Sequence, residues 1–311
     1  MGRPIVVFGS FVVDLTSRSA GLPVPGQTIL GSWFRYGPGG KGSNQAVAAH
    51  RAGADVTMVT KVGRDVFAGV ALDFYRNEGM RTDYILTDPE NSTGAALIMV
   101  DEISAQNEIV VVSGACQNIT PGDVERCGGL IRGASILLLQ HEINMDAQAA
   151  AIGIAHEAGA RIVLNPAPAM PIPEDLLSKI DIVTPNETEA HALTGVEVKN
   201  EADARRAAEV FLKKGVKSVV ITMGALGVFV TDGKRSEMLP RITVEAVDTT
   251  GAGDAFNGGF VTALSEDRDL FAAARFGNAT GALSVTRLGT APAMPFREEI
   301  DALVRENYGA I

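Results

Sequence analysis

The sequence has little cysteine, few aromatic residues and no excess of positive charge. Its 2 cysteines, Cys116 and Cys127, show no CxxC spacing and no neighbouring histidine cluster. This arrangement argues against a disulfide framework or a zinc site and favours two reduced thiols in a cytoplasmic protein. Aromatic residues make up 5% of the 311 residues, and the formal net charge is −10. A charge of that sign opposes contact with a phosphate backbone, so nucleic acid is not expected as a partner.

Long apolar runs are also missing. The apolar segment within residues 1–8 is too short for a signal peptide and is not followed by a cleavage pattern. No stretch approaches the length that is needed to cross a bilayer. We therefore expect a soluble cytoplasmic protein that has no membrane partner.

The abundant residues are alanine, valine and glycine within a hydrophobic content of 46%. That mixture suits a parallel sheet with closely packed helices. Apolar segments typical of buried strands alternate with segments of helical periodicity. The expected strands are 5–9, 56–62, 135–140, 161–165, 180–184, 218–222 and 228–231. The expected helices are 43–51, 66–78, 124–131, 147–158, 187–193 and 202–214, with helices dominating from residue 253. This alternation predicts a single α/β domain over 1–311, in which helices sandwich a mainly parallel sheet.

Two segments, about 11–37 and 82–114, interrupt this alternation. The first is broken by prolines and glycines into short alternating pieces typical of antiparallel β structure. The second contains strand-like runs at 95–100 and 108–112. We interpret both as insertions that pair with each other into a small β lid.

Familiar phosphate-binding and metal motifs are absent. The turn after the first strand, Gly9–Val12, has one glycine, whereas a dinucleotide-binding fingerprint needs three. Gly40-Lys41 is followed by glycine, not by the serine or threonine of a P-loop. His141-Glu142 resembles the start of a zinc-protease motif, but the fourth residue after His141 is Met145. Dehydrogenase, P-loop ATPase and metalloprotease functions therefore lose their main support.

The segment 248–254, Asp-Thr-Thr-Gly-Ala-Gly-Asp, is the most informative in the chain. It leads into a helix that carries Phe256, Phe260 and Leu264 on one face. A glycine-rich turn at a helix start offers free N–H groups and the positive end of the helix dipole to an anion. Asp254 stands at the same turn and could accept a proton from an attacking hydroxyl. The pattern predicts phosphoryl transfer to an alcohol.

Gly39–Asn44 opens the first long helix, and Asp14 follows the first strand. Each feature has an ordinary explanation, a flexible loop with an N-cap and a solvated aspartate respectively. Together, at the carboxyl edge of the sheet where open α/β sheets bind ligands, they also fit a clamp for adjacent hydroxyls.

Three further segments allow two interpretations. Asn186–Glu189 has the spacing of a helix cap, which is the favoured interpretation of that segment on its own. Thr222–Gly227 is either a turn between strands or a loop that contacts a nucleotide. Glu142, after an apolar strand, is either a capped loop end or a second sugar ligand.

These landmarks resemble the ribokinase-like (PfkB-type) carbohydrate kinases over nearly the whole chain, with the ribokinase branch as the closest match. The matching segments occur in the family order. They are Gly-Gly-Lys-Gly-Ser-Asn-Gln at 39–45, Leu-Asn-Pro-Ala-Pro-Ala at 164–169, Thr-Pro-Asn-Glu-Thr-Glu-Ala at 184–190, Asp-Thr-Thr-Gly-Ala-Gly-Asp-Ala-Phe-Asn-Gly at 248–258 and Ser-Val-Thr-Arg at 284–287, with Gly289 shortly after.

The resemblance implies a ribokinase-like α/β fold with a β lid and ATP-dependent phosphorylation of a sugar hydroxymethyl group. It makes Asp254 the catalytic base and gives the anion hole to the N–H groups of Gly251, Ala252 and Gly253. The implied sugar-binding residues are Asp14, Gly40, Lys41, Asn44, Glu142 and Asp254. The implied nucleotide-contacting residues are Asn186, Thr222, Gly224, Gly227, Gly253 and Asn278.

The resemblance also implies two cations and a dimer. Glu189 matches the acidic residue that organises Mg²⁺ and its waters. A loop for a monovalent cation, usually K⁺, is matched by Asp248, Thr250, Ser284, Arg287 and Gly289. Because the lid is a dimer interface in relatives, a homodimer through the lid is expected.

Two positions depart from the family pattern. Val12 stands where ribokinase has an asparagine that contacts the sugar, and an isopropyl group makes no hydrogen bond. Ala293 occupies a position that often carries a side-chain oxygen near the monovalent cation. D-ribose is the leading expected substrate, with 2-deoxyribose, a fructose-type hexose or a nucleoside as alternatives. A sugar-sensing protein that has lost the chemistry is the alternative of another class.

Overall fold

The computed structural model describes residues 2–104 and 106–309. Its main element is a nine-stranded sheet with the order β13-β12-β11-β10-β9-β8-β1-β4-β5. The strands are β1 (Ile5–Phe8), β4 (Val56–Val62), β5 (Ile85–Thr87), β8 (Ile136–Gln140), β9 (Arg161–Asn165), β10 (Ile182–Val183), β11 (Ser218–Thr222), β12 (Val228–Thr231) and β13 (Ser236–Leu239). The pairs from β11 to β5 are parallel, and only β12 and β13 add antiparallel pairs at one edge. The expected mainly parallel sheet is confirmed.

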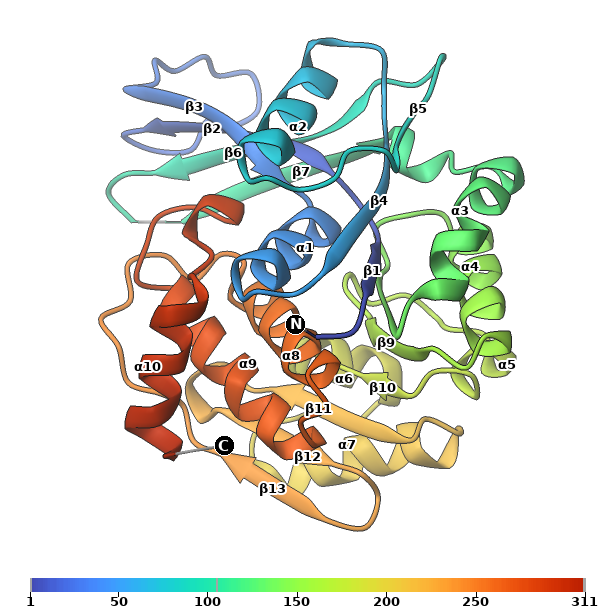
Figure 1. Ribbon diagram of the computed structural model, residues 1–311. Coiled ribbons are helices and arrows are strands. Elements are labelled where there is room, and N and C mark those ends of the chain that lie inside the picture. The colour runs from blue at the N-terminus through green and yellow to red at the C-terminus, as the bar shows by residue number, and fades with distance from the viewer. Residues whose placement is uncertain (1, 105, 310–311) are drawn as a thin grey trace.

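Helices cover both faces of this sheet because its strands are apolar on both sides. On β1, Ile5 and Val7 face one hydrophobic core, whereas Val6 and Phe8 face the other. The first core is completed by α1 (Lys41–Arg51), α2 (Val66–Asn77), α8 (Ala252–Ser265), α9 (Leu270–Ser284) and α10 (Arg297–Tyr308). The second is completed by α3 (Pro121–Gly133), α4 (Met145–Glu157), α5 (Glu174–Leu177), α6 (Glu187–Thr194) and α7 (Glu201–Lys213). Figure 1 shows α8, α9 and α10 on the side of the sheet opposite α3 and α4.

Two central helices of the first layer, α1 and α8, pack with their backbones close together. A Cβ atom added to Gly258 of α8 would lie 2.7 Å from the carbonyl oxygen of Gln45 on α1. A side chain at this position would therefore push the helices apart. The contact brings the start of α1 beside the start of α8.

A second, four-stranded sheet stands apart from the main one. It contains β2 (Val12–Ser19), β3 (Trp33–Gly39), β6 (Thr93–Asp101) and β7 (Asn107–Gly114) in the order β3-β2-β6-β7. Figure 1 shows these strands together at one end of the molecule, near α2. The two expected insertions thus pair with each other, through parallel contacts between β2 and β6. Within the second insertion, β5 instead pairs with β4 of the main sheet.

Most elements agree with the sequence-based expectation, and β4, β9, β11 and β12 match it at both ends. The sequence analysis missed β5, β13 and α5, which have three or four residues each and are too short to show a periodicity. No helix within residues 2–104 and 106–309 combines the length and apolar character required to cross a membrane.

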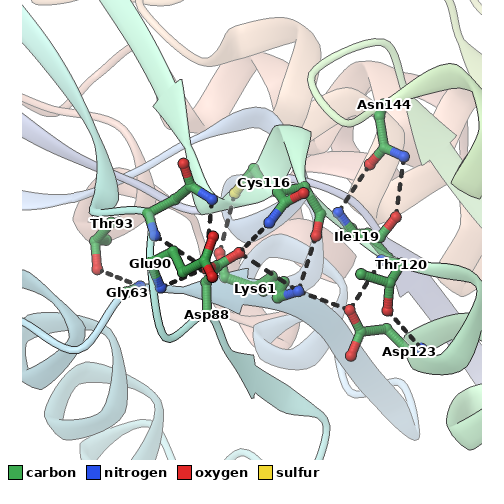
Figure 2. Close-up of polar contacts among 12 residues, drawn as sticks. Lys61, Gly63, Asp88, Glu90, Thr93, Cys116, Ile119, Thr120, Asp123 and Asn144 are labelled. Carbon is green, nitrogen blue, oxygen red and sulfur yellow. Dashed lines mark hydrogen bonds and ion pairs between the residues drawn. The ribbon is translucent and has the colours of Figure 1, made fainter.

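A polar cluster of the buried Lys61 and Asp88 with the half-buried Asp123 and the exposed Asn118 ties the small sheet to the main sheet (Figure 2). We call it the Lys61 cluster. Lys61 is 4% exposed, and its Nζ donates to the Asn118 carbonyl at 2.8 Å and to Asp123 Oδ2 at 2.7 Å. Asp88 Oδ2 lies 3.5 Å from the same nitrogen.

Asp88 is itself surrounded by donors. It accepts hydrogen bonds from the N–H groups of Glu90 and Asn91 at 2.9 Å and from the Asn118 amide at 2.6 Å. Burial works to raise the pKa of Asp88, but these donors outweigh it and hold the pKa well below its usual range. The cluster therefore fixes the chain just before β6 and just after β7.

We predict that Lys61→Met lowers the free energy of unfolding by about 3–5 kcal/mol, because a buried ion pair loses one partner. The matched control is Lys217→Met, since the Lys217 side chain is 71% exposed and its pair with Asp181 contributes about 0–1 kcal/mol. Urea denaturation of both variants measures the difference. Equal losses in the two variants would contradict the prediction.

Candidate functional site

A polar cavity of about 160 Å³ lies at the carboxyl edge of the main sheet, beside the start of α8. It is lined by Lys41, Asn165, Ala167, Thr184, Asn186, Glu189, Thr222, Thr249, Gly251, Ala252, Gly253, Asp254 and Asn257. Eight of these were predicted site residues. They come from α1, α6, β11 and the 249–254 segment, so the fold assembles them from distant parts of the sequence.

The start of α8 has the features of an anion site. Gly251 adopts a left-handed conformation with φ of +78°, which favours glycine, and no side chain caps the helix. The first N–H groups and the positive end of the helix dipole therefore face the cavity without a competing side-chain acceptor.

Asp254 lies in the first turn of α8 and is 6% exposed. Each oxygen of its carboxylate accepts one amide hydrogen bond from α1. Asn44 Nδ2 donates to Oδ2 at 2.9 Å, and Gln45 Nε2 donates to Oδ1 at 2.9 Å. The close packing of α1 on α8 makes both contacts possible. The carboxylate is thus held next to the anion site in one orientation.

Lys41 and Glu142 meet at the start of α1. Glu142 Oε2 accepts a hydrogen bond from the Lys41 N–H at 2.9 Å and another from the Ser10 hydroxyl. Burial works to lower the pKa of Lys41, but neighbouring carboxylates outweigh it and raise the pKa above its usual value. These carboxylates are Asp254, Glu142 and Glu189. Lys41 therefore carries its positive charge into the cavity at neutral pH.

Asp14, on β2, connects the cavity edge to the small sheet. Thr290 Oγ1 donates to Asp14 Oδ2 at 3.2 Å. Burial raises the pKa of Asp14 to about 6, against the opposite effect of the Thr290 hydroxyl. Asp14 does not line the cavity of about 160 Å³ but a larger, neighbouring one of about 330 Å³, together with Asp248 and Gly289.

Asn186 and Glu189 form the helix cap that their spacing predicted. Asn186 Oδ1 accepts from the Glu189 N–H at 2.8 Å, and Glu189 Oε2 accepts from the Asn186 N–H at 2.9 Å. Both residues also line the cavity. Burial raises the pKa of Glu189, although the Asn186 N–H works in the opposite direction. The capping interpretation is confirmed, and it does not exclude a role for Glu189 towards a ligand.

The other residues assigned to a nucleotide by resemblance lie in two places. Thr222 lines the cavity at the end of β11, and Gly224 and Gly227 belong to the antiparallel turn between β11 and β12. Asn278 lies deeper, and its amide donates to the Pro240 carbonyl at 2.9 Å. A Cβ atom added to Gly227 would lie 2.9 Å from the Pro240 carbonyl carbon. Gly227 and Asn278 therefore both lie against Pro240.

The segment around Asp248 is joined to the 284–290 loop. Asp248 accepts hydrogen bonds from the N–H groups of Thr250 and Gly289, both at 3.0 Å. Ser284 Oγ donates to the Gly281 carbonyl at 2.9 Å, and the Arg287 guanidinium pairs with Glu299. The Arg287 side chain is therefore engaged with Glu299, so Arg287 would contact a ligand of this loop through its main-chain carbonyl oxygen.

Sequence reasoning missed several residues that hold the site. Gln45, Asn165, Thr184 and Asn257 form a polar layer beneath Asp254, and Thr290 contacts Asp14. Gln45 and Asn165 lie in the family-matching segments 39–45 and 164–169. An amide side chain near the start of a helix or the end of a strand was the signal that could have identified them. Thr290 carried none, since its contact with Asp14 spans 276 residues.

A comparison with protein families matches residues 3–297 to the model described as pfkB family carbohydrate kinase. Ribokinase of Haemophilus influenzae is 42% identical over 299 residues, covering 96% of this chain and 97% of the relative. Deoxyribokinase of Salmonella typhi is 35% identical, covering 97% and 99%. The structure of Arabidopsis thaliana ribokinase complexed with ribose and ATP aligns with a TM-score of 0.91 at 31% identity, covering 98% of this chain and 99% of that one.

We predict that Asp14→Asn stabilises the protein at neutral pH by about 1–3 kcal/mol. The pKa of Asp14 is about 6 in the folded state against 3.8 for the free side chain, so folding disfavours its ionised form. The gain is largest above the folded-state pKa, shrinks as the pH falls towards 3.8, and vanishes below 3.8, where the side chain becomes protonated in both states. Urea denaturation at about pH 8 and about pH 5 measures this; a gain that grows on acidification would contradict it.

Proposed function

Because the chain belongs to the pfkB family of carbohydrate kinases, we propose that it transfers the γ-phosphoryl group of ATP to the terminal hydroxyl of a sugar, with D-ribose as the substrate. The observation that carries this proposal is a buried carboxylate, Asp254, in the first turn of a helix whose N-terminus has no side-chain cap. That pairing serves a reaction in which a hydroxyl loses a proton while negative charge moves on a phosphoryl group.

In this mechanism Asp254 accepts the proton of the sugar hydroxyl as it attacks. The N–H groups of Gly251, Ala252 and Gly253 face the charge that develops on the transferred group, each worth roughly 3–4 kcal/mol in such an arrangement. Lys41, at the start of α1, lines the same cavity and adds a positive charge near Asp254. Asp14, Asn44 and Glu142 provide oxygen and amide groups for the remaining hydroxyls.

The lining of the cavity fits a triphosphate with Mg²⁺. The uncapped start of α8 offers N–H donors to phosphate oxygens, and Glu189 has lone pairs beyond those used by Asn186. Magnesium prefers carboxylate and phosphate oxygens with several waters. Glu189 would organise those waters, and the ion would neutralise phosphate charge. Thr222, Gly224, Gly227 and Asn278 would hold the rest of the nucleotide.

A monovalent cation, K⁺ in the first instance, fits the loop of Asp248, Thr250, Ser284, Arg287 and Gly289. Its support is the carboxylate of Asp248, which accepts from the N–H groups of Thr250 and Gly289 and so joins the two segments. A Cβ on Gly251 would lie 3.5 Å from Cα of Thr290, so this loop packs against the anion site. A cation there would stabilise the loop that packs against the anion site. Ala293, 1% exposed, contributes no side-chain oxygen, so carbonyl groups and water would complete the shell.

We further propose that the small sheet forms a homodimer interface. Its strands expose large apolar side chains, such as Phe34 at 63%, Val110 at 58% and Val112 at 53%. Exposed apolar groups at this density favour contact with another protein surface. Sedimentation that gives the mass of one chain at micromolar concentration would exclude the dimer.

The cysteines support a cytoplasmic location for the reaction. Cys116 and Cys127 are buried and free. Burial raises the pKa of Cys127 to about 11, so its thiol stays protonated and unreactive. Unpaired thiols of this kind suit a reducing compartment.

The test of the proposed function is an ADP-coupled assay with ribose, 2-deoxyribose, fructose and nucleosides, with and without K⁺. Ribose-dependent ADP release supports the proposal, and a sugar-sensing protein would release none.

We predict that Asp254→Asn binds ribose and ATP almost normally by calorimetry but loses a factor of about 10²–10⁴ in kcat.

The control for that variant is Asp73→Asn, which removes a carboxylate that is 75% exposed, in α2, and should leave kcat unchanged. A kcat for Asp254→Asn near that of the unaltered chain would reject the base assignment.

One observation favours a second candidate, 2-deoxyribose kinase activity. Val12 lies two residues before Asp14 on β2, on the same face of the strand, and is 4% exposed. A Cβ atom added to Gly94 of β6 would lie 2.8 Å from Cγ1 of Val12, so the Val12 side chain fills the space between β2 and β6. A sugar hydroxyl facing this side chain would stay unpaired, at a cost of about 1–3 kcal/mol.

We predict that Val12→Asn shifts the ratio of kcat/KM for ribose over 2-deoxyribose towards ribose by about 5–150-fold, the equivalent of that cost. Steady-state kinetics with both sugars measures the ratio. An unchanged ratio would mean that Val12 does not contact the position where the two sugars differ.

A further inference from the structure

The layer of polar side chains around Asp254 is built almost entirely from amides. Gln45 Nε2 donates to Asp254 Oδ1 at 2.9 Å and also to Asn165 Oδ1 at 3.0 Å. Gln45 Oε1 accepts from Gln140 Nε2 at 2.6 Å. Gln45 and Gln140 are fully buried, and Asn165 is 7% exposed. Every polar atom of the Gln45 amide is therefore used.

These contacts decide which end of the Gln45 amide faces Asp254. Because Gln140 donates to Oε1, that oxygen is turned towards β8, and the Nε2 hydrogens are turned towards Asp254 and Asn165. A reversed amide would place Oε1 against the carboxylate and Nε2 against the Gln140 donor, and both contacts would be repulsive. The orientation is thus fixed by Asp254 and by Asn165, whose Nδ2 donates to the Thr184 carbonyl and whose Oδ1 must therefore accept from Gln45. Gln140 Oε1 has no hydrogen-bond partner among the described residues, so the Gln140 amide follows that of Gln45.

The same layer also fixes the start of α8. Asn165 Nδ2 donates to the Thr184 carbonyl at 2.8 Å, and the Thr184 hydroxyl donates to Asn257 Oδ1 at 2.6 Å. Asn257 Nδ2 in turn donates to the Gly253 carbonyl at 2.8 Å. The ends of β8 and β9 and the residue after β10 therefore each supply one side chain that orients Asp254 or the helix turn that carries it.

We propose that Gln45 is a positioning residue for the reaction: its amide, oriented by Asn165, holds Asp254 Oδ1 so that the carboxylate meets the sugar hydroxyl at one fixed angle. Gln45 acts through Asp254 and need not touch the substrate. This inference rests on the proposed kinase function. A displacement of about 1 Å at a reacting group can cost about 10²-fold in rate, which sets the size of the expected effect.

Two substitutions of Gln45 test the proposal. Gln45→Met keeps the length of the side chain but removes the donor to Asp254. Gln45→Glu keeps the shape and the acceptor for Gln140, but it cannot donate when ionised and adds a negative charge. We expect kcat to fall about 10²-fold in Gln45→Met with little change in sugar KM. In Gln45→Glu we expect a similar fall and an acidic limb of the kcat profile that moves to higher pH.

Other charged groups act on Asp254 and must be kept constant in that pH profile. They are Lys41 on α1, Asp14 on β2, Glu142 after β8 and Glu189 on α6. All four remain in both variants, so a shift of the limb relative to the unaltered chain reports the change at position 45.

The control for a purely structural effect is Thr262→Val. Thr262 is fully buried on α8, and its hydroxyl donates to the Gly258 carbonyl at 2.8 Å, away from the cavity. This variant should lose stability in thermal unfolding but keep the kcat and the acidic limb of the unaltered chain. The proposal is overturned if Gln45→Met keeps the kcat of the unaltered chain. It is also overturned if Thr262→Val changes kcat and the acidic limb of the pH profile as Gln45→Glu does.

Gln140→Leu provides a second test, because this single variant leaves position 45 unchanged. We expect a smaller fall in kcat, because Gln45 Oε1 loses the hydrogen bond that helps to hold the side chain in place. In the double variant with Gln45→Met, removal of Gln140 should lower kcat no further, and additive losses would overturn the proposal. Turnover by the unaltered chain tests the proposed function, and only the ratios of variant to unaltered kcat test Gln45.

Discussion

The structure depends on the close contact between α1 and α8. Gly258 has no side chain, so the backbone of α8 can approach the carbonyl oxygen of Gln45 on α1. The approach brings the amides of Asn44 and Gln45 within hydrogen-bond distance of Asp254. Without it, the carboxylate would be buried beside the anion site with no donors, which is costly for a charged group. The packing of α1 on α8 therefore also determines the geometry of the site.

The ionised carboxylates of the site lower the stability of the fold. Carboxylates of Asp14, Glu142, Glu189 and Asp254 gather around one half-buried cation, Lys41, and the start of α8. The raised pKa values of Asp14 and Glu189 show that folding disfavours their ionised forms. Such a cluster is retained because phosphoryl transfer between a sugar and a nucleotide needs fixed charges in a partly dry cavity. Elsewhere, as in the Lys61 cluster, buried charges are paired and fully hydrogen-bonded.

Much of the fold could be predicted from the sequence because its longer elements carry their own signals. The run Val56–Val62 is fully buried and apolar enough to identify β4, and glycines end the neighbouring helices. The short strands β5 and β13 have no such signal, since three or four residues form a strand only when a neighbour is already present. The small sheet could be predicted as an insertion, but not that its two halves join through a parallel pair of β2 and β6.

The residues of the site likewise fall into those that the sequence identifies and those that only the fold brings together. The sequence by itself determined the groups that must act through local geometry: the glycine turn before Asp254, the cap of Asn186 and Glu189, and the open start of α1. These features depend on backbone conformation over a few residues, which the residue types specify directly. Only the tertiary structure decided that Gln45 and Gln140 orient Asp254 and that Thr290 holds Asp14, because such contacts join atoms 95–276 residues apart. A hydrogen bond between distant segments leaves no local pattern, and it exists only once the helices and the sheet have packed.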